Sequence, residues 1–160
     1  MVSWPGDPPA RISHALDMER GDPCTVSLLE MGALKKPLQF SFIVNVLGGI
    51  PPTVESLQLQ KKIALDLAPG SEWEVIGISH CQWRMLATAL VLGGNVRVGL
   101  EDHLYLPSGE PAKSNGELVE VAARMVRDTG RKPATVEQAR QILGLDGIKP
   151  DISVASHAAS

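Results

Sequence analysis

The stretch Asn-Val-Arg-Val-Gly-Leu-Glu-Asp at residues 95–102 decides the fold prediction. Its alternation predicts a buried strand over residues 95–101, because successive side chains of a strand point to opposite faces of the sheet. One face would carry Val96, Val98 and Leu100, and the other would carry Arg97, Gly99 and Glu101. Charged side chains that face an interior are costly to bury unless they are paired or bind a ligand. Asp102 follows at the predicted carboxyl end of the strand, where parallel α/β proteins place their active sites.

The same pattern also has a purely structural interpretation. Arg97 and Glu101 can form an ion pair, and Glu101-Asp102 can form a solvated turn. Ion-pair networks perturb charged residues in the same way as functional sites do. The spacing alone therefore leaves both interpretations open.

Composition narrows the class of protein. The chain has 160 residues, of which 44% are hydrophobic and 21% charged, and its formal net charge is −3. These values are typical of one soluble globular domain. The acidity argues against nucleic acid or anionic membranes as partners, because both attract a basic surface. The longest apolar runs, such as Phe40–Leu47, fall short of the roughly 20 residues that cross a bilayer.

Two further observations favour the cytoplasm. The amino terminus shows no basic-then-apolar signal peptide. Cys24 and Cys81 have no motif spacing, so we expect reduced thiols rather than a disulfide.

Predicted helices and strands alternate along the chain. We expect strands over Val26–Glu30, Gln39–Leu47, Trp73–Ser79 and 95–101. We expect helices from Asp7 to Gly21, over Val54–Leu67 and Gln82–Leu92, from Ser114 to about Asp128, and from Thr135 to Gly144. The last two begin with the Ser-x-x-Glu and Thr-x-x-Gln spacings of a capping box. Strands separated by helices predict a parallel sheet with right-handed crossovers.

Several strings, taken in order, resemble a known family. They are Pro-Leu-Gln-Phe (37–40), Gly-Gly-Ile-Pro-Pro-Thr (48–53), Gly-Ser-Glu-Trp (70–73), Val-Ile-Gly-Ile (75–78), Gly-Gly-Asn-Val-Arg-Val-Gly-Leu-Glu-Asp (93–102), Ser-Asn-Gly-Glu-Leu-Val-Glu (114–120) and the segment 134–145. Together they resemble the C-terminal half of the beta-keto acid cleavage enzymes, from roughly Val26 to Leu145.

The resemblance implies a fold. Family members are TIM-type (β/α)8 barrels, and residues 26–145 would supply about four βα units, with strands five to eight. A complete TIM barrel typically needs about 250 residues, so we expect residues 1–160 to form one incomplete domain. Residues 1–25 match poorly and would contain a helix, and residues 146–160 would form a tail.

The resemblance also implies an activity. Family members use zinc and convert a β-keto acid and acetyl-CoA into acetoacetyl-CoA and a second product. Glu101 matches the family's carboxylate zinc ligand, and Arg97 and Asp102 match its charged catalytic pair. Asp102 would act as general base, with Arg97 holding it ionised.

This sequence departs from the family in one respect that bears on partners. The family's other two zinc ligands form a His-x-His pair, which none of His14, His80, His103 and His157 provides. A sequential Glu-Asp-His at 101–103 is a poor replacement, because one strand end cannot wrap a metal. We therefore expect a partner, either the N-terminal half-barrel or a second copy of the chain.

Two alternatives remain at this point. In the first, the chain is a non-catalytic half-barrel that self-associates through two open sheet edges. In the second, it is a different α/β binding domain that shares only the strand pattern.

Overall fold

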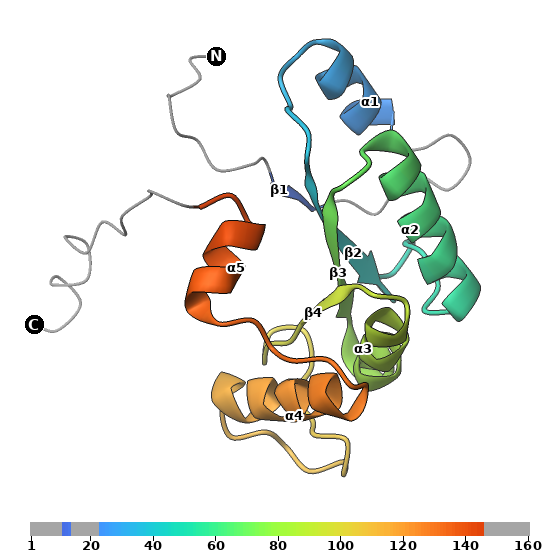
Figure 1. Cartoon of the computed structure of the whole chain (residues 1–160). Helices are drawn as coiled ribbons and strands as arrows, with labels where there is room; N and C mark the ends of the chain where they lie inside the picture. The colour runs from blue at the N-terminus through green and yellow to red at the C-terminus, as the bar shows by residue number, and fades with distance from the viewer. Residues whose placement is uncertain (1–10, 14–22, 146–160) are drawn as a thin grey trace, which may run out of the picture.

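A parallel sheet organises the chain, as the alternation of elements predicts. The computed structural model describes residues 11–13 and 23–145. Within them, four strands are ordered β1-β2-β3-β4, and every neighbouring pair is parallel. The strands are β1 (Arg11–Ser13), β2 (Gln39–Val44), β3 (Glu72–Gly77) and β4 (Asn95–Arg97) (Figure 1). This arrangement is consistent with part of a TIM-type barrel.

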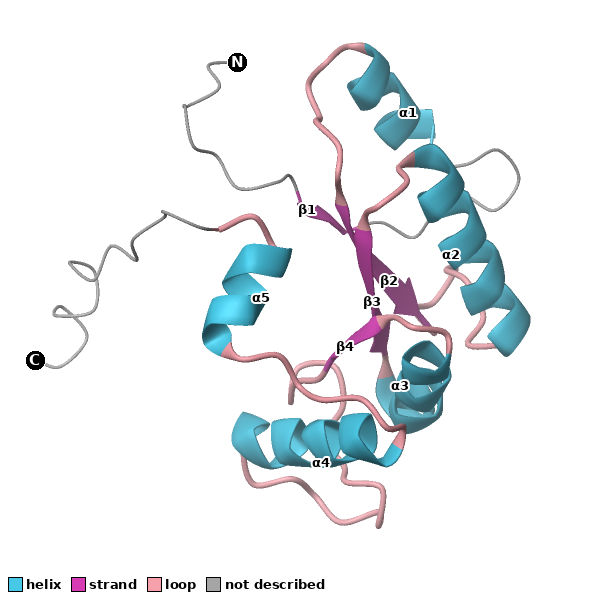
Figure 2. Ribbon diagram, in the orientation of Figure 1, coloured by secondary structure: helices cyan, strands magenta, loops and turns pink. Residues whose placement is uncertain are grey.

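Helices follow the strands in alternation. They are α1 (Pro23–Glu30), α2 (Val54–Leu67), α3 (Gln82–Val91), α4 (Asn115–Asp128) and α5 (Val136–Ile142), with the short 3-10 helix η1 (Ser79–Cys81) before α3. Figure 2 shows α2 and α3 on one side of the sheet and α5 on the other. No described helix is long and apolar enough to cross a membrane.

The core lies between the sheet and α2 and α3. Alternate strand residues such as Phe42 and Val75 are fully buried there against Leu57 of α2 and Leu86 of α3. Because side chains alternate along a strand, the opposite face carries a more polar set. That set comprises Gln39, Ser41, Ile43, Glu72, Glu74, Ile76, Asn95 and Arg97.

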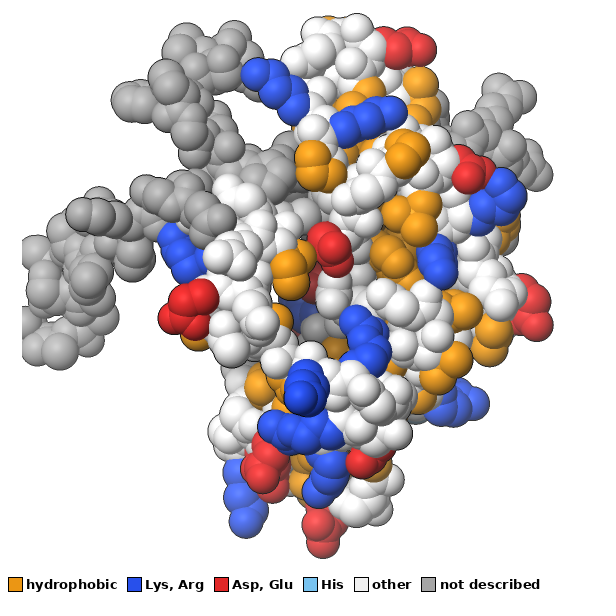
Figure 3. Space-filling view, viewed as in Figure 1, with side chains coloured by type: hydrophobic (Ala, Val, Ile, Leu, Met, Phe, Trp, Pro, Cys, Tyr) orange, Lys and Arg blue, Asp and Glu red, His pale blue; other side chains and the backbone are white. Residues whose placement is uncertain are grey.

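Helix α5 covers the amino end of this polar face. The side chain of Gln39 donates to the carbonyl oxygen of Leu143 at 3.3 Å. A cavity of about 190 Å³ lies between the helix and the strands, with Glu72 and Ile142 among its lining residues. Figure 3 shows the molecule hollowed here, with acidic side chains at the rim. In barrel proteins this end of the strands serves stability rather than chemistry.

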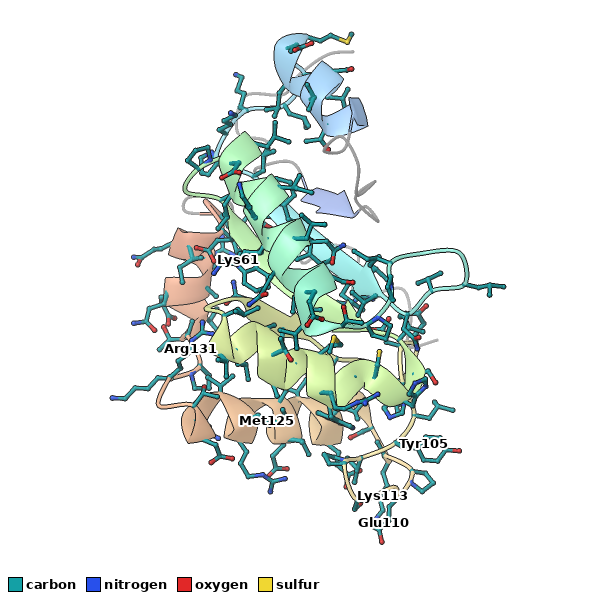
Figure 4. All side chains as sticks on the ribbon, turned by 90° about the vertical axis from the view of Figure 1, so that its right-hand side faces the viewer. Lys61, Tyr105, Glu110, Lys113, Met125 and Arg131 are labelled. Carbon is teal, nitrogen blue, oxygen red and sulfur yellow. The ribbon has the colours of Figure 1, made fainter. Side chains whose placement is uncertain are left out.

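Two basic side chains hold the turn that leads into β4. Lys61 donates to the carbonyl oxygen of Leu92 at 2.7 Å, and Arg131 donates to that of Gly94 at 2.6 Å. Figure 4 labels both residues. Cations at a helix C-terminus satisfy its free carbonyl groups and its dipole. They therefore fix the position from which the strand at residue 95 begins.

Two predictions for the first thirty residues are wrong. The segment Val26–Glu30, predicted as a strand, lies in helix α1. A short apolar run fits a buried strand and a helix equally well, and Pro23 at the first helical position favours the helix. The helix predicted from Asp7 to Gly21 is contradicted at Arg11–Ser13, which form β1 beside β2. The remainder of that segment lies outside the described residues, as does the predicted tail.

Later elements agree better with the prediction. The helices over 54–67, 82–92, 114–128 and 135–144 are confirmed within a few residues. The capping box of Thr135 and Gln138 is complete. At α4, Ser114 accepts from the backbone of Glu117 as predicted, but the Glu117 carboxylate accepts from the backbone of Lys113 rather than from that of Ser114.

The strand predicted over 95–101 is wrong in length and burial. The strand β4 ends at Arg97, and residues 100–102 form a turn. Val96 and Val98 pack against the core as the alternation predicts. The strand lies at the edge of the sheet with one neighbour, however, so its other face is not enclosed.

Candidate functional site

The carboxyl ends of β2, β3 and β4 are joined by hydrogen bonds at one edge of the sheet. Asn45, which follows β2, donates through Nδ2 to the carbonyl oxygen of Ile78 at 2.8 Å. Ser79, which follows β3, donates its backbone N–H to the carbonyl oxygen of Asp102 at 2.9 Å. The turn after β4 is thereby fixed against its neighbour, at the edge where parallel α/β proteins place their ligands.

Asp102 is the buried carboxylate of this edge. Its side chain is 4% exposed, and Oδ2 has no hydrogen-bond partner within the described part of the chain. Its backbone N–H donates to the carbonyl oxygen of Gly99 at 3.0 Å. A buried acceptor without a donor costs about 1–3 kcal/mol, so this carboxylate is not explained by stability.

Arg97 brings the predicted site residues together. Its Nη2 lies 3.5 Å from Oδ2 of Asp102 and 3.6 Å from Oε2 of Glu101. The sequence therefore identified three charged groups that meet. The predicted burial is wrong for two of them, since the side chains of Arg97 and Glu101 are 46% and 85% exposed.

The charges around Asp102 act on its acidity in opposite directions. Burial raises the pKa of the Asp102 carboxyl above its ordinary value, because a desolvated carboxylate is disfavoured. The nearby guanidinium of Arg97 opposes this rise, and the neighbouring carboxylate of Glu101 adds to it. Asp102 is thus a stronger base than an exposed aspartate and remains beside a cation.

Two histidines lie beside the turn. Burial lowers the pKa of His103, and the nearby charge of His80 lowers it further. Neither residue completes a metal site, because the described residues contain no group of three or more His, Cys, Asp or Glu side chains that could hold a metal ion.

The loop between β4 and α4 is anchored beside these histidines. The indole Nε1 of Trp83 donates to the carbonyl oxygen of Tyr105 at 3.0 Å. Farther along, the backbone N–H of Leu106 donates to the carbonyl oxygen of Glu110 at 2.8 Å. Figure 4 labels Tyr105, Glu110 and Lys113 on this loop.

Sequence reasoning missed Asn45 and Ser79 as residues that join the strand ends at this edge. Both have left-handed backbones, with φ of 69° and 63°. Such residues are uncommon apart from glycine, although asparagine is enriched among them. An asparagine directly after an apolar strand was the available signal for Asn45, whereas nothing in the local sequence marks Ser79.

Comparison with known proteins identifies the family of the chain. The beta-keto acid cleavage enzyme family matches residues 23–145 of the chain. This chain belongs to the beta-keto acid cleavage enzyme family. The resemblance seen in the sequence is thereby confirmed.

Curated relatives in this family have related names. The chain is 40% identical over 116 residues to the 3-keto-5-aminohexanoate cleavage enzyme of Fusobacterium nucleatum. The aligned region covers 72% of this chain and 41% of the relative. The chain is 39% identical over 120 residues to the enzyme of the same name from Acetoanaerobium sticklandii, or 75% of this chain and 43% of the relative.

A third relative is named for a different reaction. The 3-oxoadipate:acetyl-CoA acetyltransferase of Cupriavidus necator is 34% identical over 126 residues, which cover 79% of this chain and 44% of the relative. The chain thus spans about two fifths of the length of the curated family members that it matches.

Proposed function

We propose that this chain supplies one part of the active site of a zinc-dependent beta-keto acid cleavage enzyme, which converts a β-keto acid and acetyl-CoA into acetoacetyl-CoA and a second product. The observation that carries the proposal is the buried Asp102 carboxylate, which lies 3.5 Å from Arg97 at the carboxyl edge of the sheet. The name of a family relative includes acetyl-CoA, which supports acetyl-CoA as the proposed substrate.

Asp102 and Arg97 have complementary roles in this proposal. Asp102 takes up and returns one proton at Oδ2, the atom that has no donor in the described part of the chain. A base with a raised pKa accepts a proton more readily near neutral pH. The half-exposed guanidinium of Arg97 keeps Asp102 ionised and binds the carboxylate of the β-keto acid, because a guanidinium fits a carboxylate well.

Zinc requires ligands from outside the described residues. Those residues hold no group of three ligating side chains, so they do not form a zinc site by themselves. Glu101 is 85% exposed and is free to contribute one carboxylate ligand to a shared site. We propose that the other ligands come from the remainder of a barrel.

The proposed active site is therefore completed by strands that lie outside the described residues. The described residues would supply strands five to eight, and the remainder of the barrel would supply the other strands and pair with the open edges of β1 and β4. Closing a barrel removes the unpaired strand edges that otherwise favour aggregation. We place the enzyme in the cytoplasm, because Cys81 is a free thiol, as a reducing compartment would keep it.

Complementation tests this proposal. The chain is co-expressed with the part of the Fusobacterium nucleatum relative that it does not cover, and zinc content and acetoacetyl-CoA formation are measured on the purified complex. We expect Glu101→Gln to lower the zinc content strongly. The matched control Glu110→Gln changes an exposed carboxylate of the following loop and should leave zinc bound. Equal zinc stoichiometry in wild type and Glu101→Gln would reject the ligand assignment.

The sheet edges favour a second candidate function. Edge strands β1 and β4 each have one neighbour, and exposed strand edges invite pairing with another copy. The chain alone would then be a self-associating, non-catalytic half-barrel. A purified chain that is monomeric by light scattering would exclude this candidate, whereas a dimer without zinc or activity would favour it.

A further inference from the structure

We infer that Asn115 is a positioning residue, whose side chain holds the turn that carries Glu101 and Asp102. The inference deepens the proposed function and rests on it, because the turn matters for catalysis only if these two carboxylates do. Asn115 itself is not placed in contact with substrate.

The contact that carries the inference joins the first residue of α4 to the turn. Oδ1 of Asn115 accepts the backbone N–H of Leu100 at 2.8 Å. Leu100 lies inside a turn closed by Gly99, whose carbonyl oxygen accepts the backbone N–H groups of Asp102 and His103, each at 3.0 Å. Within the described part of the chain, Asn115 makes the only side-chain hydrogen bond to the backbone of residues 99–103.

The helix itself does not need this amide. The N-cap of α4 is Ser114, whose hydroxyl oxygen accepts the backbone N–H of Glu117 at 3.2 Å. The buried side chains of Leu118 and Val121 pack the helix against the rest of the protein. Asparagine at the following position is a poor helix former, so its presence is better explained by the bond to Leu100.

The geometry also places Asn115 near the reactive carboxylate. A Cβ built on Gly99 would lie 3.5 Å from Oδ2 of Asp102 and 3.9 Å from Oδ1 of Asn115. Both oxygens therefore flank the same glycine. The backbone of Ser79 holds the turn from the side of β3, and Asn115 holds it from the side of α4.

Amide hydrogen exchange on the full chain tests the inference. We expect Asn115→Ala to speed exchange of the Leu100 amide about tenfold relative to exchange of the Val75 amide in β3, because the Leu100 amide loses one hydrogen bond. Referring the rate to Val75 removes any global change in stability. Asn115→Asp keeps an acceptor oxygen in the same place and should restore protection.

Asn95→Ala is the matched control. Asn95 is exposed and donates to Glu72 at 2.9 Å, away from the turn, so its replacement should leave the Leu100 amide protected. The inference is overturned if Asn115→Ala leaves the relative rate at Leu100 unchanged, or if Asn115→Asp exchanges as fast as Asn115→Ala.

Kinetics on the complemented enzyme separate positioning from a merely structural role. We expect Asn115→Ala to lower kcat about tenfold with little change in KM, because misplacing a catalytic group slows the reaction more than it weakens binding. Asn115→Asp should recover kcat. An unchanged kcat overturns the inference and leaves the proposed function standing. A wild-type complex that forms no acetoacetyl-CoA rejects the proposed function, and the exchange measurement alone then decides on Asn115.

Discussion

The Nη2 atom of Arg97 lies 3.5 Å from the buried carboxylate of Asp102 and 3.6 Å from the exposed carboxylate of Glu101. An exposed ion pair such as that with Glu101 contributes only about 0–1 kcal/mol. The two carboxylates thus share one cation but differ in solvation. This difference suits one of them to proton transfer and leaves the other accessible to a ligand.

Replacing the two neighbours of Asp102 should move its acidity in opposite directions. Arg97→Gln removes the cation that favours the ionised form, so we expect the pKa of Asp102 to rise further. Glu101→Gln removes a like charge, so we expect the pKa of Asp102 to fall. Carboxyl carbon NMR titration of the purified chain measures both shifts. Shifts of the same sign would contradict the assigned neighbours.

Asp102→Asn should stabilise the chain at neutral pH. The folded-state pKa of Asp102 is raised above its ordinary value of 3.8 by burial, so its protonated form is favoured in the folded state. The free energy of unfolding therefore falls as the pH rises from about 4 through the folded-state pKa. The Asp102→Asn variant carries no ionisable group at this position and avoids this decrease. Its free energy of unfolding at pH 7 should therefore exceed that of wild type by on the order of 1 kcal/mol.

Urea unfolding at pH 4 and pH 7 measures this effect. The control Glu110→Gln removes an exposed carboxylate and should keep the wild-type pH dependence. A variant Asp102→Asn that is less stable than wild type at pH 7 would show that the ionised carboxylate is well accommodated.

The sequence was sufficient to predict a helix or strand where local signals and burial agree. The helix that starts at Thr53 has an N-cap and an apolar side, and the structure has it over Val54–Leu67. The strand predicted over Val26–Glu30 was wrong because a short apolar run does not distinguish a strand from a helix. The helix predicted over Arg11–Ser13 was wrong because this segment pairs with Gln39–Ser41. This long-range contact overrides the local helical pattern.

The candidate site was predictable in its residues but not in its surroundings. Alternation along residues 95–102 identified Arg97, Glu101 and Asp102, which the structure brings together. The alternation could not show that the strand ends at Arg97, because the turn depends on bonds from Ser79 and Asn115. Those partners come from distant segments and left no periodic signal.

Histidine acidity near the site should depend on a single neighbour. Burial lowers the pKa of His103 below its ordinary value of 6.5, and the charge of His80 lowers it further. His80→Asn should therefore raise the pKa of His103 while leaving it below 6.5. NMR titration of the imidazole protons measures the shift, with Arg84→Gln as a control on the adjacent helix.

The same shift predicts a pH dependence of stability. With a lowered folded-state pKa, the unfolded chain binds the proton of His103 more readily, so stability is lost as the pH falls through about 6.5. His80→Asn should lose less stability than wild type between pH 7.5 and pH 5. Identical losses would show that His80 does not act on His103.

Gly94 should tolerate no side chain, whereas Gly99 should accept one. A Cβ at Gly94 would lie 2.4 Å from the ring of Trp73, which is only 5% exposed in the core. Gly94→Ala must displace this ring and should cost about 1–3 kcal/mol, the usual penalty of overpacking. A Cβ at Gly99 meets its nearest atom at 3.5 Å, an ordinary contact, so Gly99→Ala should stay within about 0.5 kcal/mol of wild type. Urea unfolding of both variants checks the contrast, and equal stabilities would refute the close packing of Trp73 on the turn before β4.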